Sequence, residues 1–153
     1  MSEFLDKVAV VTGAGRGIGN AIAKKLASKG AKIAAISRSV ENSQSCADEI
    51  NSEFPDAAKP YSVDVSNHDA MIDAGKSVLE DFGKVDILIN NAGVTRDNLM
   101  LRMTEEEWDV VLNTNLKGAF NSVKAFQRSL LKQGGARIIN ISSVIGLIGN
   151  SGQ

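Results

Sequence analysis

Cysteine and histidine each occur only once in the 153 residues, and this scarcity excludes several kinds of site. The single Cys46 has no partner for an internal disulfide, and its place among apolar residues of an expected helix predicts a core side chain rather than a reactive thiol. His68 has no cysteine cluster beside it, which argues against a zinc site or a histidine-based catalytic triad. We expect His68 to lie in the solvated first turn of a helix.

Excess charge and long apolar runs are also missing. A net charge of −1 at pH 7 provides no field that would attract nucleic acid or an anionic membrane. No apolar run approaches the length of a membrane span, and the first six residues lack the basic and then apolar profile of a signal peptide. We therefore expect a cytoplasmic protein with no membrane or nucleic-acid partner, an organellar form being the alternative.

Short apolar segments alternate with amphipathic segments along the chain, and no linker or repeat interrupts them. This alternation is typical of βαβ units. We expect strands at residues 7–12, 31–37, 59–64, 85–90 and 136–142, and helices at about 16–29, 41–53, 67–82 and 105–132. Helix starts are predicted by Ser66-x-x-Asp69 and Thr104-x-x-Glu107, and helix ends by Gly30, Gly83 and Gly134.

These elements predict a single α/β domain over residues 1–153 with a Rossmann-type fold. Right-handed crossovers would give a doubly wound parallel sheet in the order 3-2-1-4-5, between two layers of helices. The ligand crevice is then expected at the carboxyl ends of the strands, between strands 1 and 4.

The turn after the first strand, TGAGRGIG at residues 12–19, carries the clearest functional signal. Glycines at alternate positions allow a tight bend, keep Cβ atoms out of the path of a phosphate and let the next helix pack on the strand. The helix N-terminus then directs its free N–H groups at the turn, which predicts a pyrophosphate site. A purely steric use of glycine is the alternative. The expected cofactor contacts are Gly13, Ala14, Gly15, Arg16, Gly17, Ile18 and Gly19.

Strand 2 ends in Ser37-Arg38, where NAD-binding enzymes carry an acidic residue. A carboxylate there would repel a 2′-phosphate, whereas a hydroxyl and a guanidinium would bind it. Arg16 can reach the same phosphate from the other side. The sequence therefore favours NADP(H) over NAD(H), although Arg38 taken alone could be an ordinary exposed loop arginine.

Two further segments follow strands 3 and 4. Asp64-Val65 could accept a hydrogen bond from the adenine amino group and cover its ring, or Asp64 could be a loop carboxylate. In the segment 90–93, NNAG, Asn91, Ala92 and Gly93 would permit close approach of the cofactor's ribose and tie neighbouring strands together. An Asn-Gly turn is the alternative for that segment.

Five motifs in this order and spacing resemble the short-chain dehydrogenase/reductase family: TGAGRGIG, Asp64-Val65, NNAG, the segment 113–116 (NTNL) and Ile141-Ser142-Ser143. The resemblance covers the whole chain. Within the family, the loops at 93–103 and 146–153 are similar to those of reductases that act on 3-oxoacyl groups carried by acyl carrier protein in fatty acid synthesis. This implies NADPH-dependent reduction of that thioester and a homotetrameric full-length form. An acetoacetyl-CoA or small-carbonyl reductase, or an NADP-binding module without chemistry, are the alternatives.

By the same resemblance, Ser143 would hydrogen-bond the substrate carbonyl and Asn115 would hold a water of the proton relay. From the residues alone, Ser143 is a hydroxyl at a strand end and Asn115 a polar interruption of a helix.

One element of the family's pattern is missing. Similar reductases carry a Tyr-x-x-x-Lys pair a few residues past the position of Gln153, and the only tyrosine here, Tyr61, falls in strand 3. We interpret the chain as the amino-terminal, cofactor-binding part of such a reductase. We expect it to be inactive by itself and expect the strand at 136–142 to form an unprotected apolar edge.

Overall fold

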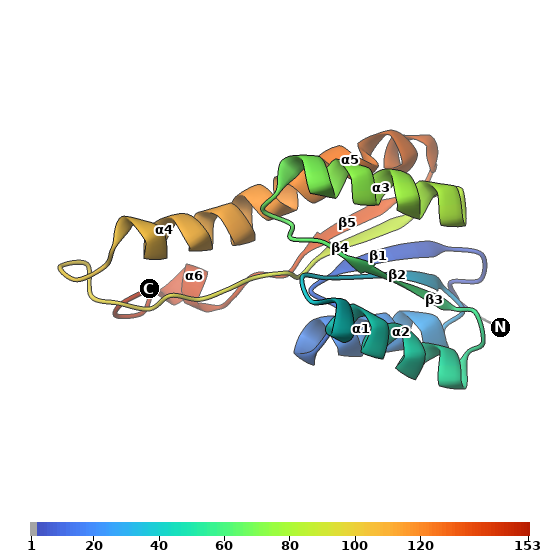
Figure 1. Cartoon of the computed structure of the whole chain (residues 1–153), viewed down its shortest axis with the longest axis horizontal. Coiled ribbons are helices and arrows are strands. Elements are labelled where there is room, and N and C mark those ends of the chain that lie inside the picture. Colours follow the sequence, from blue (N-terminus) through green and yellow to red (C-terminus); the bar gives the residue numbers. More distant parts are fainter. Residues whose placement is uncertain (1–2) are drawn as a thin grey trace.

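The computed structural model describes residues 3–153 as helices packed on both faces of a parallel sheet (Figure 1). The strand order is β3-β2-β1-β4-β5, which confirms the predicted doubly wound α/β fold. The strands are β1 (Val8–Thr12), β2 (Lys32–Ser37), β3 (Ala58–Ser62), β4 (Ile87–Asn90) and β5 (Arg137–Asn140). Helices α1 (Gly17–Ser28) and α2 (Val40–Glu53) cover one face, and α3 (His68–Phe82) and α5 (Gly118–Lys132) cover the other.

The segment predicted as one helix over 105–132 is divided into three parts. It begins as α4 (Glu105–Val111), widens into the π-helical segment η1 (Leu112–Lys117) and continues as α5. Figure 1 shows α4 extending beyond the sheet, on the same side as the short helix α6 (Ile145–Ile148). No helix of residues 3–153 is both long and apolar enough to span a bilayer.

The core has two halves, one on each face of the sheet. All five residues of β1 are buried, as expected for a central parallel strand, with Ala9 and Val11 facing α1 and α2 and Val10 facing α3 and α5. Cys46 lies buried in the first half, as predicted. Burial raises the pKa of its thiol, which keeps it protonated and unreactive.

Apart from the division of the 105–132 segment, the predicted helix starts and ends agree with the structure except at the cap of α3. Thr104 and Glu107 form a reciprocal capping box at the start of α4, and Gly83 takes the left-handed conformation after α3. Asn67, not Ser66, caps α3 by accepting a hydrogen bond from the Ala70 N–H at 3.1 Å. Ser66 instead donates to Asp64, because its hydroxyl lies 2.7 Å from that carboxylate.

Thr12 and Asn91 join the ends of the two central strands. Thr12, only 2% exposed, accepts hydrogen bonds at Oγ1 from the N–H groups of Asn91 and Ala92, both at 3.0 Å. The Asn91 amide nitrogen donates in return to the carbonyl oxygens of Thr12 and Gly13 at 3.0 and 3.3 Å. This Thr12–Asn91 junction confirms that the NNAG segment ties neighbouring strands together.

At the opposite end of the sheet, Asp86 holds the starts of β1 and β4. Its side chain is 3% exposed and accepts from the Val8 N–H at 3.0 Å. The ammonium groups of Lys7 and Lys84 lie 3.0 and 3.2 Å from its two oxygens. Burial alone would raise the pKa of Asp86, but these three donors hold it below its ordinary value.

Strand β5 forms one edge of the sheet and pairs only with β4 among the described residues. All four of its residues are exposed, and Ile138 and Ile139 are 44% and 47% exposed. The predicted apolar edge is therefore present in the described structure.

We predict that Asp86 makes the fold acid-sensitive. Because its pKa is lower in the folded state, its stabilisation is complete above about pH 4 and is lost as the pH falls through the folded-state pKa. Asp86→Asn should lower the free energy of unfolding at pH 7 by about 2 kcal/mol and by less near pH 3. Urea titrations at both pH values measure this. Asp73→Asn, which removes an exposed carboxylate paired with Lys76, is the control and should change little.

We also predict that the Thr12–Asn91 junction depends on the Thr12 hydroxyl. Thr12→Val keeps the shape but leaves two N–H groups without their acceptor, and should destabilise the fold by about 2 kcal/mol. Thr12→Ser retains the oxygen and should recover most of that loss. Thermal unfolding of both variants tests this, and equal loss for Val and Ser would show that the methyl group matters instead.

Candidate functional site

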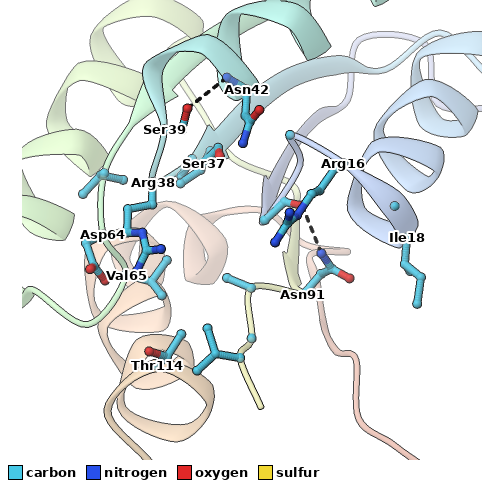
Figure 2. Close-up of a pocket in the computed structure, with 18 residues that line it drawn as sticks. Arg16, Ile18, Ser37, Arg38, Ser39, Asn42, Asp64, Val65, Asn91 and Thr114 are labelled. Carbon is cyan, nitrogen blue, oxygen red and sulfur yellow. Dashed lines mark hydrogen bonds between the residues drawn. The ribbon is translucent and has the colours of Figure 1, made fainter. Parts of the chain in front are cut away.

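A cleft of about 510 Å³ opens at the carboxyl ends of the strands, where the crevice was predicted (Figure 2). Its walls come from the β1–α1 turn and from the segments that follow β2, β3 and β4. Of the predicted cofactor contacts, all but Ala14 and Gly19 line it: Gly13, Gly15, Arg16, Gly17, Ile18, Ser37, Arg38, Asp64, Val65, Asn91, Ala92 and Gly93.

Ala14 and Gly19 lie beneath the turn rather than in the cleft. The Ala14 N–H donates to the Ile36 carbonyl at 3.0 Å and so ties the turn to β2. A Cβ on Gly19 would lie 2.2 Å from the Gly13 carbonyl oxygen, so any side chain there would push the turn away from α1. Both residues shape the turn through packing.

The N-terminus of α1 faces this cleft without a side-chain cap. Its N-cap residue, Arg16, has an extended backbone and makes no capping hydrogen bond, and the first turn contains no acidic residue. Because the first N–H groups of a helix lack intrahelical acceptors and carry partial positive charge, this end of α1 is suited to an anion.

Two arginines supply positive charge to the cleft. Figure 2 shows Arg16 and Arg38 approaching it from different walls. Both are exposed, and within residues 3–153 neither guanidinium has an ion-pair or hydrogen-bond partner in the protein. Two guanidiniums at one cleft, neither paired within the described residues, favour an anionic ligand there.

The start of α2 contributes two cleft residues that sequence reasoning missed. Ser39 caps this helix by accepting from the Asn42 N–H at 3.3 Å, and both residues line the cleft beside Ser37. Asn42 packs against the turn, because a Cβ added to Gly15 would lie 2.5 Å from the Asn42 Cβ. The S-x-x-N pattern could have indicated a helix cap, but not contact with the distant turn.

Asp64 and Val65 form the wall that follows β3. Asp64 accepts at Oδ1 from the Ser66 N–H and hydroxyl at 2.9 and 2.7 Å, and its other oxygen has no partner among the described residues. Val65 is 6% exposed and packs on Gly118 of α5, where a Cβ would lie 2.6 Å from Val65 Cγ2. One free carboxylate oxygen beside an apolar wall can bind an amino group on a flat ring.

A second hollow of about 640 Å³ adjoins the cleft and shares Arg16, Asn91 and Gly93 with it. Ser143 and Asn115, the predicted catalytic residues, both line this hollow, as does Ser142. Asn115 lies in the π-helical segment and bonds to both backbone groups of Val94, accepting from its N–H at 2.8 Å and donating to its carbonyl at 2.9 Å.

Asn90 lines the same hollow and carries an unsatisfied acceptor that is buried beneath its surface. Its amide nitrogen donates to Asn140 Oδ1 at 2.8 Å, whereas its own Oδ1 has no hydrogen-bond partner among residues 3–153. A buried acceptor of this kind is ordinarily satisfied by a bound water.

A third hollow of about 370 Å³ lies beyond Ser143, and its surface is mostly apolar although Arg96, Asp97 and Glu107 also line it. It shares Asn115, Ser142 and Ser143 with the second hollow, and α4, η1 and α6 enclose its far side with Trp108, Val111, Leu112 and Ile145. Met103 completes the apolar lining. Sequence reasoning did not find this hollow, because its residues come from segments without a recognisable motif.

Tyr61 and His68 lie away from Ser143. Tyr61 is on β3, at the opposite edge of the sheet from β5, a separation of about 19 Å across four strand spacings. Its hydroxyl donates to Asp81 at 2.5 Å, and burial together with that carboxylate raises its pKa. His68 is exposed in the first turn of α3, as predicted, and within residues 3–153 no cluster of His, Cys, Asp or Glu could hold a metal ion.

Known proteins are similar to this chain in sequence and in fold. The family model described as short chain dehydrogenase matches residues 7–153. The 3-oxoacyl-[acyl-carrier-protein] reductases FabG of Vibrio cholerae serotype O1 and Staphylococcus aureus strain Mu50 are 46% and 45% identical to this chain, over 96% and 97% of its residues. These matches cover 59% and 61% of the two relatives.

A solved structure is also similar to this chain in fold and sequence. The crystal structure of NAD⁺-bound xylitol dehydrogenase superimposes with a TM-score of 0.92 and 35% sequence identity. It covers 98% of this chain, and the chain covers 58% of it. The chain thus spans about 60% of the length of the relatives it matches. On the match over residues 7–153, it belongs to the short chain dehydrogenase family, a family of oxidoreductases.

Proposed function

We propose that the full-length protein is a cytoplasmic, NADPH-dependent reductase that converts 3-oxoacyl thioesters of acyl carrier protein to 3-hydroxyacyl thioesters. The observation that carries this proposal is the continuity of the three hollows. An anion-binding cleft leads to Ser143 and Asn115, and these in turn border an apolar hollow. The FabG relatives, which are 3-oxoacyl-[acyl-carrier-protein] reductases, indicate the substrate class.

The described residues fit a nicotinamide dinucleotide. The uncapped start of α1 would hold the pyrophosphate, and the free oxygen of Asp64 would accept from the adenine amino group while Val65 covers the ring. The nicotinamide end would lie in the second hollow, which adjoins the cleft and contains Ser143. When bound in reduced form, the cofactor supplies a hydride to the substrate ketone.

Arg16 and Arg38 support NADPH as the reduced cofactor. A 2′-phosphate between the two guanidiniums would pair with both, and neither would have to give up a protein partner. Ser37 and the start of α2 add hydrogen-bond donors on the same wall.

Ser143 is suited to binding the ketone oxygen, because it faces the second and third hollows together. As hydride reaches the carbonyl carbon, negative charge develops on the oxygen, and a hydroxyl donor there stabilises it. Asn115, fixed by both Val94 backbone groups, keeps the neighbouring loop in place and can orient water. We assign the proton donor to the part of the relatives' length that this chain does not span, because Tyr61 is at the other edge of the sheet.

The third hollow would accept the acyl chain. Trp108, Val111, Leu112 and Ile145 provide apolar surface next to Ser143, and each methylene buried there contributes about 0.8 kcal/mol. A substrate with a short polar body would leave this surface uncovered. The third hollow therefore favours an acyl thioester over a sugar or a simple alcohol.

A homotetramer is proposed for the full-length protein. Leu116 and Phe120, four residues apart on η1 and α5, are 68% and 57% exposed and line none of the three hollows. Large exposed apolar side chains of this kind are typical of a protein interface.

We predict that Arg38→Asp selectively weakens NADPH binding. Replacing attraction by repulsion at the 2′-phosphate should raise the NADPH dissociation constant about a hundredfold and that of NADH less than about threefold. Fluorescence titration of the full-length protein measures both. Lys25→Asp makes the same charge change on the exposed face of α1, outside the cleft, and should alter neither constant appreciably. Equal losses for NADPH and NADH in Arg38→Asp would overturn the assignment of Arg38.

The reaction itself is tested with the full-length protein and three substrates: a 3-oxoacyl thioester of acyl carrier protein, its CoA thioester, and a small carbonyl compound. We expect the carrier-protein thioester to be reduced with the highest kcat/KM. Ser143→Ala should lower kcat about a hundredfold with little change in NADPH affinity, whereas Ser142→Ala serves as the neighbouring-hydroxyl control. Turnover of only a sugar or simple alcohol contradicts the proposal, and NADPH binding without any oxidation indicates a binding module.

A further inference from the structure

Asn121 on α5 supports the adenine end of the cleft from behind. It is fully buried and does not line the cleft. Its amide nitrogen donates to the carbonyl oxygens of Val65 and Ser66 at 2.8 and 3.3 Å. These two residues belong to the loop between β3 and α3 that carries the adenine-facing wall. A single side chain thus fixes the backbone of this loop to α5, the helix that packs beside α3 on the same face of the sheet.

His68 completes the hydrogen bonding of Asn121. The Asn121 Oδ1 lies 2.9 Å from His68 Nδ1. Because two carbonyls require the amide nitrogen to be the donor, the oxygen must accept, and His68 Nδ1 must therefore carry the hydrogen. The imidazole also stacks on Phe120, with ring centroids 6.5 Å apart and an angle of 23° between the planes. Neutral and protonated imidazole can both donate this bond.

Ser66 connects Asn121 to Asp64 through hydrogen bonds within the loop between β3 and α3. Ser66, whose carbonyl accepts from Asn121, donates its own N–H and hydroxyl to Asp64 Oδ1. These two bonds leave the second carboxylate oxygen as the one available to a ligand. Gly118, one turn before Asn121, lets Val65 pack directly on α5. Hydrogen bonds and packing from α5 therefore set the position of both residues of the adenine wall.

We propose that Asn121, held by His68, is a positioning residue that fixes Asp64 and Val65 for recognition of the adenine ring. This inference rests on the cofactor placement given under Proposed function. Asn121 acts only through Ser66 and Val65, because it does not itself reach the cleft. A ligand group recognised by one carboxylate oxygen is sensitive to small shifts of that oxygen, so loss of the support should reduce discrimination between bases.

The test compares NADPH with its hypoxanthine analogue, in which a carbonyl oxygen replaces the 6-amino group of adenine. The full-length protein should bind NADPH about tenfold more tightly, since the analogue offers Asp64 an acceptor instead of a donor. In Asn121→Ala this ratio of dissociation constants should fall to about two or less, with the NADPH constant itself rising about tenfold. Asp64→Ala defines the ratio expected when the carboxylate is absent.

Ser129→Ala is the matched control on the same helix. Ser129 is also a buried polar residue of α5, but its hydroxyl accepts from the Val85 N–H at 2.8 Å, near the start of β4. It should lower the melting temperature to a similar degree and leave the base ratio unchanged. A purely structural role for Asn121 would make the two variants behave alike.

His68→Phe keeps the proposal testable if Asn121→Ala does not fold. His68 is exposed, and phenylalanine can keep the stacking on Phe120 while removing the Nδ1 donor. The base ratio should fall about threefold in this variant, because Asn121 keeps its bonds to the loop but loses the bond that orients it. The dissociation constants of NADPH and its hypoxanthine analogue are measured for His68→Phe in the same way.

The outcomes separate this inference from the proposed function. If Asp64→Ala abolishes base discrimination while Asn121→Ala and His68→Phe retain the wild-type ratio, the positioning role is overturned and the cofactor placement stands. If Asp64→Ala also keeps the full ratio, the adenine placement is wrong and the inference falls with it. Failure to reduce a 3-oxoacyl thioester changes neither reading, because all these measurements use binding alone.

Discussion

The Thr12–Asn91 junction is the constraint on which the rest of the site depends. Strands β1 and β4 are paired over only three residues each, so the positions of the segments beyond them are set by what joins their ends. Thr12 Oγ1 receives two N–H groups there, and a Cβ on Gly13 would lie 2.9 Å from the Ala92 Cα. The glycine turn and the NNAG segment therefore form one packed unit, and both the start of α1 and the hollow containing Ser143 are positioned from it.

At one end of the sheet the polar groups have partners within the protein, whereas at the other end several have none. This difference indicates which end binds a ligand. At the amino end, Asp86 has a backbone donor and two ammonium groups. At the carboxyl end, two guanidiniums, one oxygen of Asp64 and Asn90 Oδ1 have no partners among the described residues, and α1 begins without a cap. The two guanidiniums and the uncapped start of α1 all lie at the cleft, so this end of the sheet is the one suited to a polar, anionic ligand.

The sequence predicted those features that short segments encode by themselves. Strand order followed from alternating apolar and amphipathic segments, and twelve of fourteen expected cofactor residues line the cleft because glycine turns and strand ends fix their own backbone. Ser39, Asn42 and Asn121 were missed, since their roles arise from packing against segments distant in the chain. The π-helical segment was missed for a related reason. Asn115 lies in this segment and bonds to Val94, a contact between residues that are distant in the sequence.

The continuous run from η1 into α5 explains how distant parts of the cleft keep a fixed spacing. Asn115 holds Val94 beside the hollow that contains Ser143, and Gly118 and Asn121 hold Val65 and Ser66 at the wall that follows β3. All three residues lie on one helical rod, which buries Phe126 and Leu130 against the sheet. A dinucleotide must satisfy both ends at once, so a rigid rod contacting both can hold the two sites at the separation that one ligand requires.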